Sequence, residues 1–282
     1  MRSAPSVRMR RLAARLRELR ESAGLTQEEV SERTGKDRST LYRLESAQQR
    51  PQRSTLIQLL DLYGVDEPLR GDLLTLLREA KQRGWMLPYQ SELPVVYSDY
   101  IGLEDEARSI SNYESLFVPG LLQTEAYARA QIRGTLPHAS EDDVQIRVAA
   151  RMERQPVLSK KGAPKLWAIM DEAALRRQIG SRDVMREQAE RLLEVRSQPN
   201  VTIQVVPFGA GAHPGMDGPF VLLEFSGAAD QSIVYIESAA GGLFLEEEAE
   251  IRRYILMFEH LRAAASGLDA TAALLGQIAA EI

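Results

Sequence analysis

The stretch Thr26–Glu45 reads TQEEVSERTGKDRSTLYRLE and decides how the N-terminal part of the chain folds. Thr26 is a candidate N-cap, and Glu29 follows it at the spacing of a capping box, which predicts the start of a short helix. Gly35 can adopt the positive φ that ends a helix and turns the chain. Asp37 is a second candidate N-cap, so a second short helix completes the stretch. The sequence therefore predicts two short helices joined by a glycine turn.

The second of these helices, residues 38–45, separates its apolar side chains from its polar ones. Leu41 and Leu44 form its buried pair, and the side chains left facing outward are Arg38, Ser39, Tyr42 and Arg43. In a helix-turn-helix the second helix lies in the DNA major groove. There an arginine binds guanine O6 and N7, and serine or tyrosine contacts a base or a phosphate. The same spacing also fits an ordinary helical hairpin with a solvated polar face.

Three further helices are predicted around this pair. Residues 8–22 place leucines at intervals of four and three, which is the stripe of an amphipathic helix. Residues 54–63 and 66–83 show the same kind of pattern. Together the five helices predict an all-α helix-turn-helix domain at residues 1–83. Residues 84–99 contain two prolines and begin without a helical period, so we expect a linker there.

Residues 8–65 resemble the XRE, or λ/434-repressor-like, helix-turn-helix family. The matching features are Leu25–Glu29, Gly35, Ser39–Leu41, Leu44-Glu45, Pro51 and Leu62–Val65. The resemblance implies that Arg38, Ser39 and Arg43 read bases, that Gln27 opens its helix against a phosphate, and that Arg50 and Arg53 touch the DNA backbone. The residues expected at phosphates are Thr26, Gln27, Lys36, Arg50 and Arg53. The chain departs from the family at Ser46-Ala47, where Asn-Gly or Ser-Gly is common.

The net charge of −5 hides an asymmetry along the chain. Residues 1–64 hold 13 Lys and Arg against 8 Asp and Glu, whereas residues 65–282 hold 22 against 32. A basic N-terminal module on an acidic body is the distribution expected when nucleic-acid binding is confined to one end. The chain contains no cysteine, which excludes disulfides and thiol chemistry and fits a cytoplasmic protein. No apolar run approaches the roughly 20 residues of a membrane span.

The remainder, residues 100–282, predicts a larger α+β domain. Strand-like apolar stretches occur at residues 165–170, 201–207, 220–225 and 233–236, so we expect a sheet of about four strands backed by helices. Residues 100–113 show a helical pattern. Residues 246–265 and 268–280 are expected to be closing helices that pack on the sheet or on a second subunit.

One predicted helix of this domain, residues 140–155, carries an arginine stripe. Arg147, Arg151 and Arg154 recur at intervals of four and three and so share one face. Such a stripe either faces solvent and pairs with neighbouring acids, or meets DNA or an acidic partner. The first of these two arrangements is the commoner one.

Residues 100–280 also resemble a known group. The matching segments are Ile110–Glu114, Val118–Thr124, Met170–Leu175, Asn200–Phe208 and Gly211–His213. They are similar to the uncharacterised, antitoxin-like domain that follows an XRE-type helix-turn-helix in many actinobacterial regulators. The resemblance implies a transcriptional regulator, often with a small partner protein encoded nearby, and it supplies no catalytic residue.

The glycine-rich segment 208–219 is the most distinctive loop of this domain. It lies between two predicted strands and opens no helix, so it lacks the geometry of a phosphate-binding loop. A loop that covers a pocket or meets a partner is the better interpretation, with Phe208, His213 and Asp217 as its candidate contact residues. The three histidines have no metal-ligand spacing, and no catalytic motif is present.

These observations predict a transcriptional regulator that is not an enzyme and needs no metal or cofactor. Its expected partners are double-stranded DNA, a second copy of itself and a small protein or ligand that acts through the C-terminal domain. The alternative is a small-molecule-binding protein or an enzyme in that domain, with an auxiliary helix-turn-helix.

Overall fold

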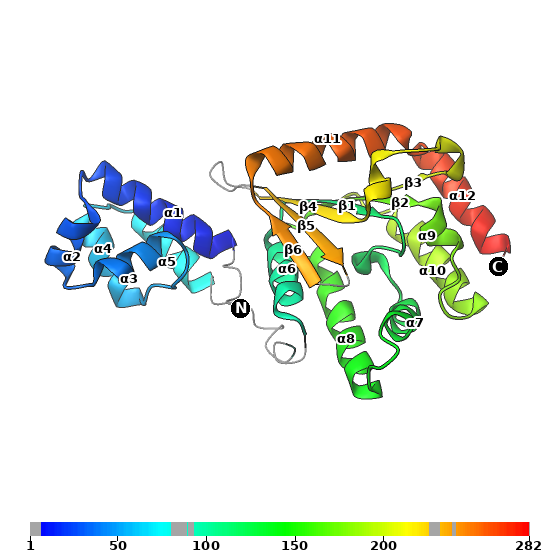
Figure 1. Cartoon of the computed structure of the whole chain (residues 1–282), viewed down its shortest axis with the longest axis horizontal. Coiled ribbons are helices and arrows are strands. Elements are labelled where there is room, and N and C mark those ends of the chain that lie inside the picture. The colour runs from blue at the N-terminus through cyan, green and yellow to red at the C-terminus, as the bar shows by residue number, and fades with distance from the viewer. Residues whose placement is uncertain (1–6, 80–88, 90–92, 226–231, 239–240, 282) are drawn as a thin grey trace. The chain divides into compact units, whose positions relative to one another are not determined.

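The computed structural model divides the chain into two compact units, Met1–Leu87 and Pro88–Ile282. The residues that it describes are 7–79, 89, 93–225, 232–238 and 241–281 (Figure 1). Each unit is described by itself below.

The described part of the N-terminal unit consists of helices and short turns. Its helices are α1 (Val7–Ser22), α2 (Gln27–Thr34), α3 (Arg38–Glu45), α4 (Arg53–Leu62) and α5 (Leu69–Glu79). The fifth helix begins three residues later than residue 66, where the sequence predicted it. The last four residues of its predicted range, 80–83, lie outside the described residues. The helical content expected for this unit is confirmed.

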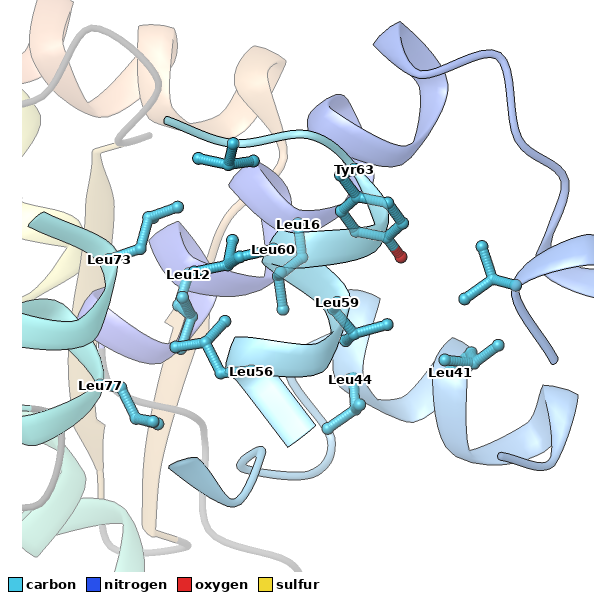
Figure 2. Close-up of a cluster of buried hydrophobic side chains, with 12 residues drawn as sticks. Leu12, Leu16, Leu41, Leu44, Leu56, Leu59, Leu60, Tyr63, Leu73 and Leu77 are labelled. Atoms are coloured by element: carbon cyan, nitrogen blue, oxygen red, sulfur yellow. The ribbon is translucent and has the colours of Figure 1, made fainter. Parts of the chain in front are cut away.

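Leucines fill the core of this unit, and every described helix except α2 contributes two or more of them (Figure 2). They recur three or four residues apart within each helix, so each helix buries one stripe. The fully or nearly fully buried members are Leu12, Leu16, Leu41, Leu44, Leu56, Leu59, Leu60, Leu73 and Leu77. Burial of one such side chain stabilises the fold by about 1.5–3 kcal/mol. The outward-facing residues of α3 are therefore set by the two leucines on its inner side.

Turns of this unit adopt the left-handed backbone conformation at Gly24, Gly35, Ala47 and Gly64. Gly35 ends α2 with φ 66°, as the sequence predicted. Ala47, after α3, has φ 57° although it carries a side chain. Glycine enters this region without steric cost, whereas alanine does not. The departure from the family pattern at Ser46-Ala47 therefore places strain directly behind α3.

The second unit contains a six-stranded mixed sheet rather than about four strands. Its strands are β1 (Ser109–Glu114), β2 (Lys165–Asp171), β3 (Val201–Val206), β4 (Phe220–Glu224), β5 (Ile233–Ser238) and β6 (Gly241–Leu245). The prediction was wrong at β1, which had been assigned to a helix, and at β6, which had been missed. Ser111 and Asn112 give β1 a polar appearance although both are buried. Two glycines in β6 lower its apparent strand propensity.

The strand order is β3-β2-β1-β4-β5-β6. The pairs β1–β2 and β2–β3 are parallel, and the other neighbours are antiparallel. The crossover from β1 to β2 runs through α7 (Glu125–Thr135) and α8 (Glu141–Arg154), and that from β2 to β3 through α9 (Glu172–Arg176) and α10 (Arg182–Val195). Parallel strands require such long crossovers. The carboxyl ends of β1, β2, β3 and β5 consequently lie at the same end of the sheet.

Helices lie on both faces of the sheet (Figure 1). One face packs against α11 (Glu248–Ala264), whose Ile251, Phe258 and Leu261 belong to one buried cluster with Tyr113 and Phe220. On the opposite face lie α8 and α6 (Val95–Glu106). Helix α6 includes residues 95–99, which the sequence had placed in the linker. The rest of that segment lies largely outside the described residues.

The two edges of the sheet differ. At β3 the connection to α12 (Leu268–Glu281) covers the edge, since Ser266 N–H donates to the Val205 carbonyl at 2.8 Å and Val205 N–H donates to Thr271 Oγ1 at 3.3 Å. At the other edge, β6 has Leu243 exposed over 54% of its surface. Only β3 is therefore protected by its own chain among the described residues.

Candidate nucleic-acid interface

A complete capping box begins α2. The Glu29 N–H donates to Thr26 Oγ1 at 3.2 Å, and the Thr26 N–H donates to Glu29 Oε2 at 2.7 Å. These bonds satisfy two backbone donors at the helix start. The hydrogen bonds that the Glu29 carboxyl accepts from the Thr26 N–H and hydroxyl lower the pKa of that carboxyl. At α3 Asp37 occupies the N-cap position, but its side chain makes no capping hydrogen bond. The local signals thus position α2 more firmly than the start of α3.

The four candidate base-reading residues occupy the outer side of α3. Arg38, Ser39 and Tyr42 are exposed, Tyr42 over 55% of its surface, and Arg43 is half-buried. Arg38 forms an exposed ion pair with Glu28 of α2. Arg43 donates from Nε to Gln49 Oε1 at 3.1 Å and from Nη2 to Thr40 Oγ1 at 3.0 Å. Both guanidiniums are held by exchangeable partners, which leaves them available to an incoming guanine edge.

The candidate phosphate-contacting residues fall into two groups. Three of them already hold bonds within the unit: Thr26 in the capping box, Gln27 through Nε2 to Glu45 Oε2 at 2.8 Å, and Arg50 through Nη2 to the Leu77 carbonyl at 2.6 Å. Arg53 is exposed at the first residue of α4, and Lys36 is half-buried in the turn before α3. The structure therefore gives Arg50 a role in tethering α5, which the sequence had not indicated.

A part-buried ion pair joins the first and third helices. Arg20 of α1 donates from Nε to Glu45 Oε1 at 2.7 Å and from Nη2 to Glu45 Oε2 at 3.1 Å, and its Nη1 reaches the Leu25 carbonyl at 2.8 Å. The side chains are only 11% and 7% exposed, and the hydrogen bond to Glu45 raises the pKa of Arg20. Together with Gln27, this cluster fixes α1, the start of α2 and the end of α3 as one frame.

Sequence reasoning missed this ion pair. Glu45 lies four residues after Leu41, on the buried side of α3, so a carboxylate in need of a cationic partner could have been recognised. The identity of that partner could not, because Arg20 is 25 residues away in sequence.

In the second unit, loop 208–219 connects β3 to β4 at the end of the sheet where β1, β2 and β3 terminate. The Phe208 N–H donates to Glu172 Oε2 at 2.9 Å, and His213 Nε2 lies 3.2 Å from Asp171 Oδ2. The side chain of His213 is only 7% exposed and stands edge-on to the ring of Tyr113, with 6.1 Å between centroids. Gly215 packs directly on that tyrosine, where an added Cβ would lie 2.4 Å from the ring.

The three candidate residues of this loop have different surroundings. His213 is buried against Asp171, whereas Phe208 is exposed over 60% of its surface. Asp217 Oδ2 lies 4.0 Å from Arg253 Nη2 of α11, an exposed pair. The loop thus buries the side chain of His213 beside Asp171 and leaves Phe208 facing solvent.

A second polar cluster is buried beneath the sheet. Arg154 of α8 donates to Glu104 of α6 at 3.0 Å and to the Tyr97 hydroxyl at 2.8 Å, and its side chain is only 5% exposed. Burial opposes the charge on Arg154, but Glu104, Tyr97, Tyr100 and Glu237 together outweigh it and raise the pKa of the guanidinium. Arg151, by contrast, is held by Gln123 Oε1 at 2.9 Å and Gln131 Oε1 at 2.6 Å. The predicted arginine stripe is therefore an interior network at two of its three positions.

Glu114, at the end of β1, lies within reach of these arginines. Burial and the charge of Glu237 raise the pKa of Glu114 to about 8, although Arg151 and Arg154 oppose the shift. Burial of the carboxyl favours its neutral form. The carboxyl edge of the sheet thus carries a glutamic acid that is largely protonated at neutral pH.

The described residues contain no group of three or more His, Cys, Asp or Glu side chains placed to hold a metal ion. None of the helices in the described ranges combines the length and the apolar character that a membrane crossing requires.

Comparison with known families agrees with this geometry. Residues 11–73 match the model of a helix-turn-helix domain, which defines a DNA-binding protein of regulatory type. Residues 97–277, more than half of the chain, match the family described as domain of unknown function DUF5753, and the chain belongs to that family. No curated protein and no solved structure matches the chain.

Proposed function

We propose that this protein is a sequence-specific transcriptional regulator of the XRE type that reads its operator with α3. The observation that carries the proposal is the outer side of that helix. Arg38, Ser39, Tyr42 and Arg43 project from it, while the Arg20–Glu45 pair holds it in place. Arginines can discriminate guanine, and the neighbouring hydroxyls can contact thymine or phosphate.

The regulator acts as a dimer in this proposal. One short recognition helix offers few base contacts, whereas two helices about 34 Å apart read two half-sites on one side of the duplex. A pseudo-palindromic operator follows from the two-fold symmetry.

The second unit modulates DNA binding by receiving a small partner protein or a small ligand. Support comes from loop 208–219, which exposes Phe208 beside the buried His213–Asp171 pair. The sequence resemblance to antitoxin-like regulators favours a small protein as the partner.

A small-molecule-binding role for the second unit is the alternative. It is favoured by the position of Tyr113, Asp171 and His213 at the carboxyl ends of β1 and β2, the edge where open α/β sheets bind ligands. Binding of a metabolite with no effect of added DNA on its affinity would support this alternative over a ligand-controlled regulator.

The salt dependence of binding to a generic duplex tests the phosphate contacts, measured by fluorescence anisotropy. Arg53→Ala should weaken binding to all sequences alike and lower the salt slope by about one. Arg133→Ala, which removes an exposed arginine from the second unit, is the matched control and should leave the slope unchanged. Equal slopes for the wild type and Arg53→Ala would remove Arg53 from the interface.

A further inference from the structure

The outer edge of β6 lacks the protection found at most edge strands. Gly241–Leu245 reads GGLFL and contains no charge and no proline. Natural edge strands usually carry such residues or are covered by another segment, as β3 is here. Among the described residues, β5 is the only strand that pairs with β6.

The register shows which backbone groups β6 presents outward. Ser238 pairs with Gly241 across a two-residue connection, so these two residues form a hydrogen-bonded pair. The Ser238 hydroxyl also donates to the Gly241 carbonyl at 3.1 Å, which turns that carbonyl toward β5. Hydrogen-bonded and non-hydrogen-bonded positions alternate along an antiparallel ladder. The N–H and C=O groups of Gly242 and Phe244 therefore point away from β5.

We propose that two copies of this chain dimerise by antiparallel pairing of β6 with β6, with the two-fold axis at Leu243. Gly242 then lies opposite the partner subunit's Phe244, and both residues have their free N–H and C=O groups aimed at each other. This is the isologous arrangement that a symmetric dimer requires. The proposal rests on the proposed function in one respect, since it supplies the dimer that the two half-sites need.

The side chains of β6 are self-complementary in this register. Each Phe244 faces the partner subunit's Gly242, and each Leu245 faces the partner subunit's Gly241, so in both of these pairs a large residue meets a glycine. Gly242 cannot be larger, because an added Cβ would lie 2.6 Å from the Tyr235 ring and 2.8 Å from Val96. Leu243, exposed over 54% of its surface, meets its own copy at the axis. Such cross-strand apolar pairs stabilise sheets by about 0.2–1 kcal/mol each.

The charges around β6 favour the same register. An acidic run, Glu246–Glu248, follows the strand directly. With the axis at Leu243, the two runs leave the pairing at opposite ends and do not face each other. An axis at residue 247 would place each Glu246 opposite the partner subunit's Glu248, and like charges opposite one another destabilise a ladder. The acidic run after the uncharged strand therefore disfavours a pairing shifted toward residue 247, whereas the axis at Leu243 keeps the two runs apart.

Cysteine cross-linking tests the position of the axis, because the chain has no cysteine of its own. In Leu243→Cys the two thiols occupy a non-hydrogen-bonded pair with Cα atoms about 4.5 Å apart, within disulfide range. Mild oxidation of the full-length variant at micromolar concentration should give a disulfide-linked dimer on a non-reducing gel. Leu256→Cys, at a site of similar exposure on α11, should stay unlinked. A wild type that is monomeric by light scattering, or a dimer that Leu243→Cys fails to link, would overturn the proposal.

A charged variant gives a second, independent readout. Leu243→Lys places two ammonium groups at the axis and should raise the dimer dissociation constant by roughly 100-fold. Leu256→Lys should leave it unchanged, and unaltered far-ultraviolet circular dichroism would show that both variants fold. If wild-type DNA binding is sequence-specific while Leu243→Lys remains fully dimeric, the β6 interface is wrong and the regulator proposal stands. If Leu243→Lys is monomeric and the wild type binds no duplex, the β6 interface is right and the regulator proposal is wrong.

Discussion

Each unit of this protein contains an arginine–glutamate pair that joins two helices distant in sequence, and the two pairs serve different ends. Arg20–Glu45 in the helical unit lies at the margin of a leucine core and orients α3. Arg154–Glu104 in the α+β unit is fully enclosed by Tyr97, Tyr100 and the sheet. In the first unit the candidate DNA-contacting side chains face solvent, on the helix that the ion pair orients. In the second unit the polar groups themselves are buried.

This difference explains why the sequence predicts the functional residues of the first unit better than those of the second. A helix-turn-helix exposes its functional residues on one short helix, so local spacing is enough to find them. The buried network of the second unit is assembled from α6, α7, α8 and β1, and no local pattern links those segments. The following predictions test the comparison between the two pairs, from the largest expected effect to the smallest.

Breaking the enclosed Arg154–Glu104 pair should cause the largest loss of stability. Arg154→Met leaves Glu104 buried without its cationic partner and should lower the free energy of unfolding of the second unit by about 3–5 kcal/mol. Hydrogen exchange followed by mass spectrometry would report each unit separately. The exposed pair Arg133–Glu141 provides the control, since Arg133→Ala should change stability by less than about 1 kcal/mol. Equal effects of the two variants would mean that enclosure does not matter here.

The corresponding change in the first unit should cost less. Arg20→Met should destabilise the helical unit by about 2–4 kcal/mol, because the pair it breaks is partly reached by solvent. Exchange should rise in α1 and α3 while the second unit stays protected. A loss of protection confined to the second unit would contradict the assignment of this pair.

Base-reading substitutions should leave stability intact and change DNA binding. Arg43→Ala should weaken binding to the preferred duplex by about 1–3 kcal/mol and reduce discrimination at one position. Arg50→Ala, which removes the bond to the Leu77 carbonyl, should instead lower the stability of α5 with little change in discrimination. Competition titrations with single-base variants of the duplex would separate the two outcomes. Loss of discrimination with Arg50→Ala alone would move the recognition surface away from α3.

The protonated Glu114 predicts a pH dependence of the second unit. Its pKa is about 8 in the folded protein, above that of an unfolded chain, so the folded state binds the extra proton. The free energy of unfolding should therefore fall as the pH rises from about 4.5 to about 8. Glu114→Gln cannot ionise and should be more stable than the wild type at pH 9, but not at pH 4. Parallel pH profiles for the two proteins in urea unfolding would exclude this role for Glu114.

The smallest effect concerns the turn behind α3. Ala47→Gly relieves a left-handed alanine and should stabilise the helical unit by about 1 kcal/mol or less. Exchange protection of α3 and α4 would measure it. A destabilised variant would show that burial of the Ala47 methyl group outweighs the backbone strain.

The sequence predicted the helical unit closely because its signals are local. The capping box at Thr26, the turn at Gly35 and the leucine stripes each lie within one or two helices. In the second unit four strands were apparent from runs of apolar residues. β1 was assigned to a helix because its buried Ser111 and Asn112 broke the apolar pattern, and β6 was missed because two of its residues are glycine. The pairing of Arg154 with Glu104, and of His213 with Asp171, depends on three-dimensional proximity that spacing does not encode.

In vitro selection from a pool of random duplexes tests the central claim most directly. The full-length protein and its Arg38→Ala/Arg43→Ala double variant would be taken through the same rounds, with sequencing of the bound fractions. The account predicts that the wild type enriches a motif of two related half-sites about one helical turn apart. The double variant should remain folded and enrich no such motif. Equal enrichment by both proteins, or no enrichment by the wild type, would contradict DNA recognition by α3.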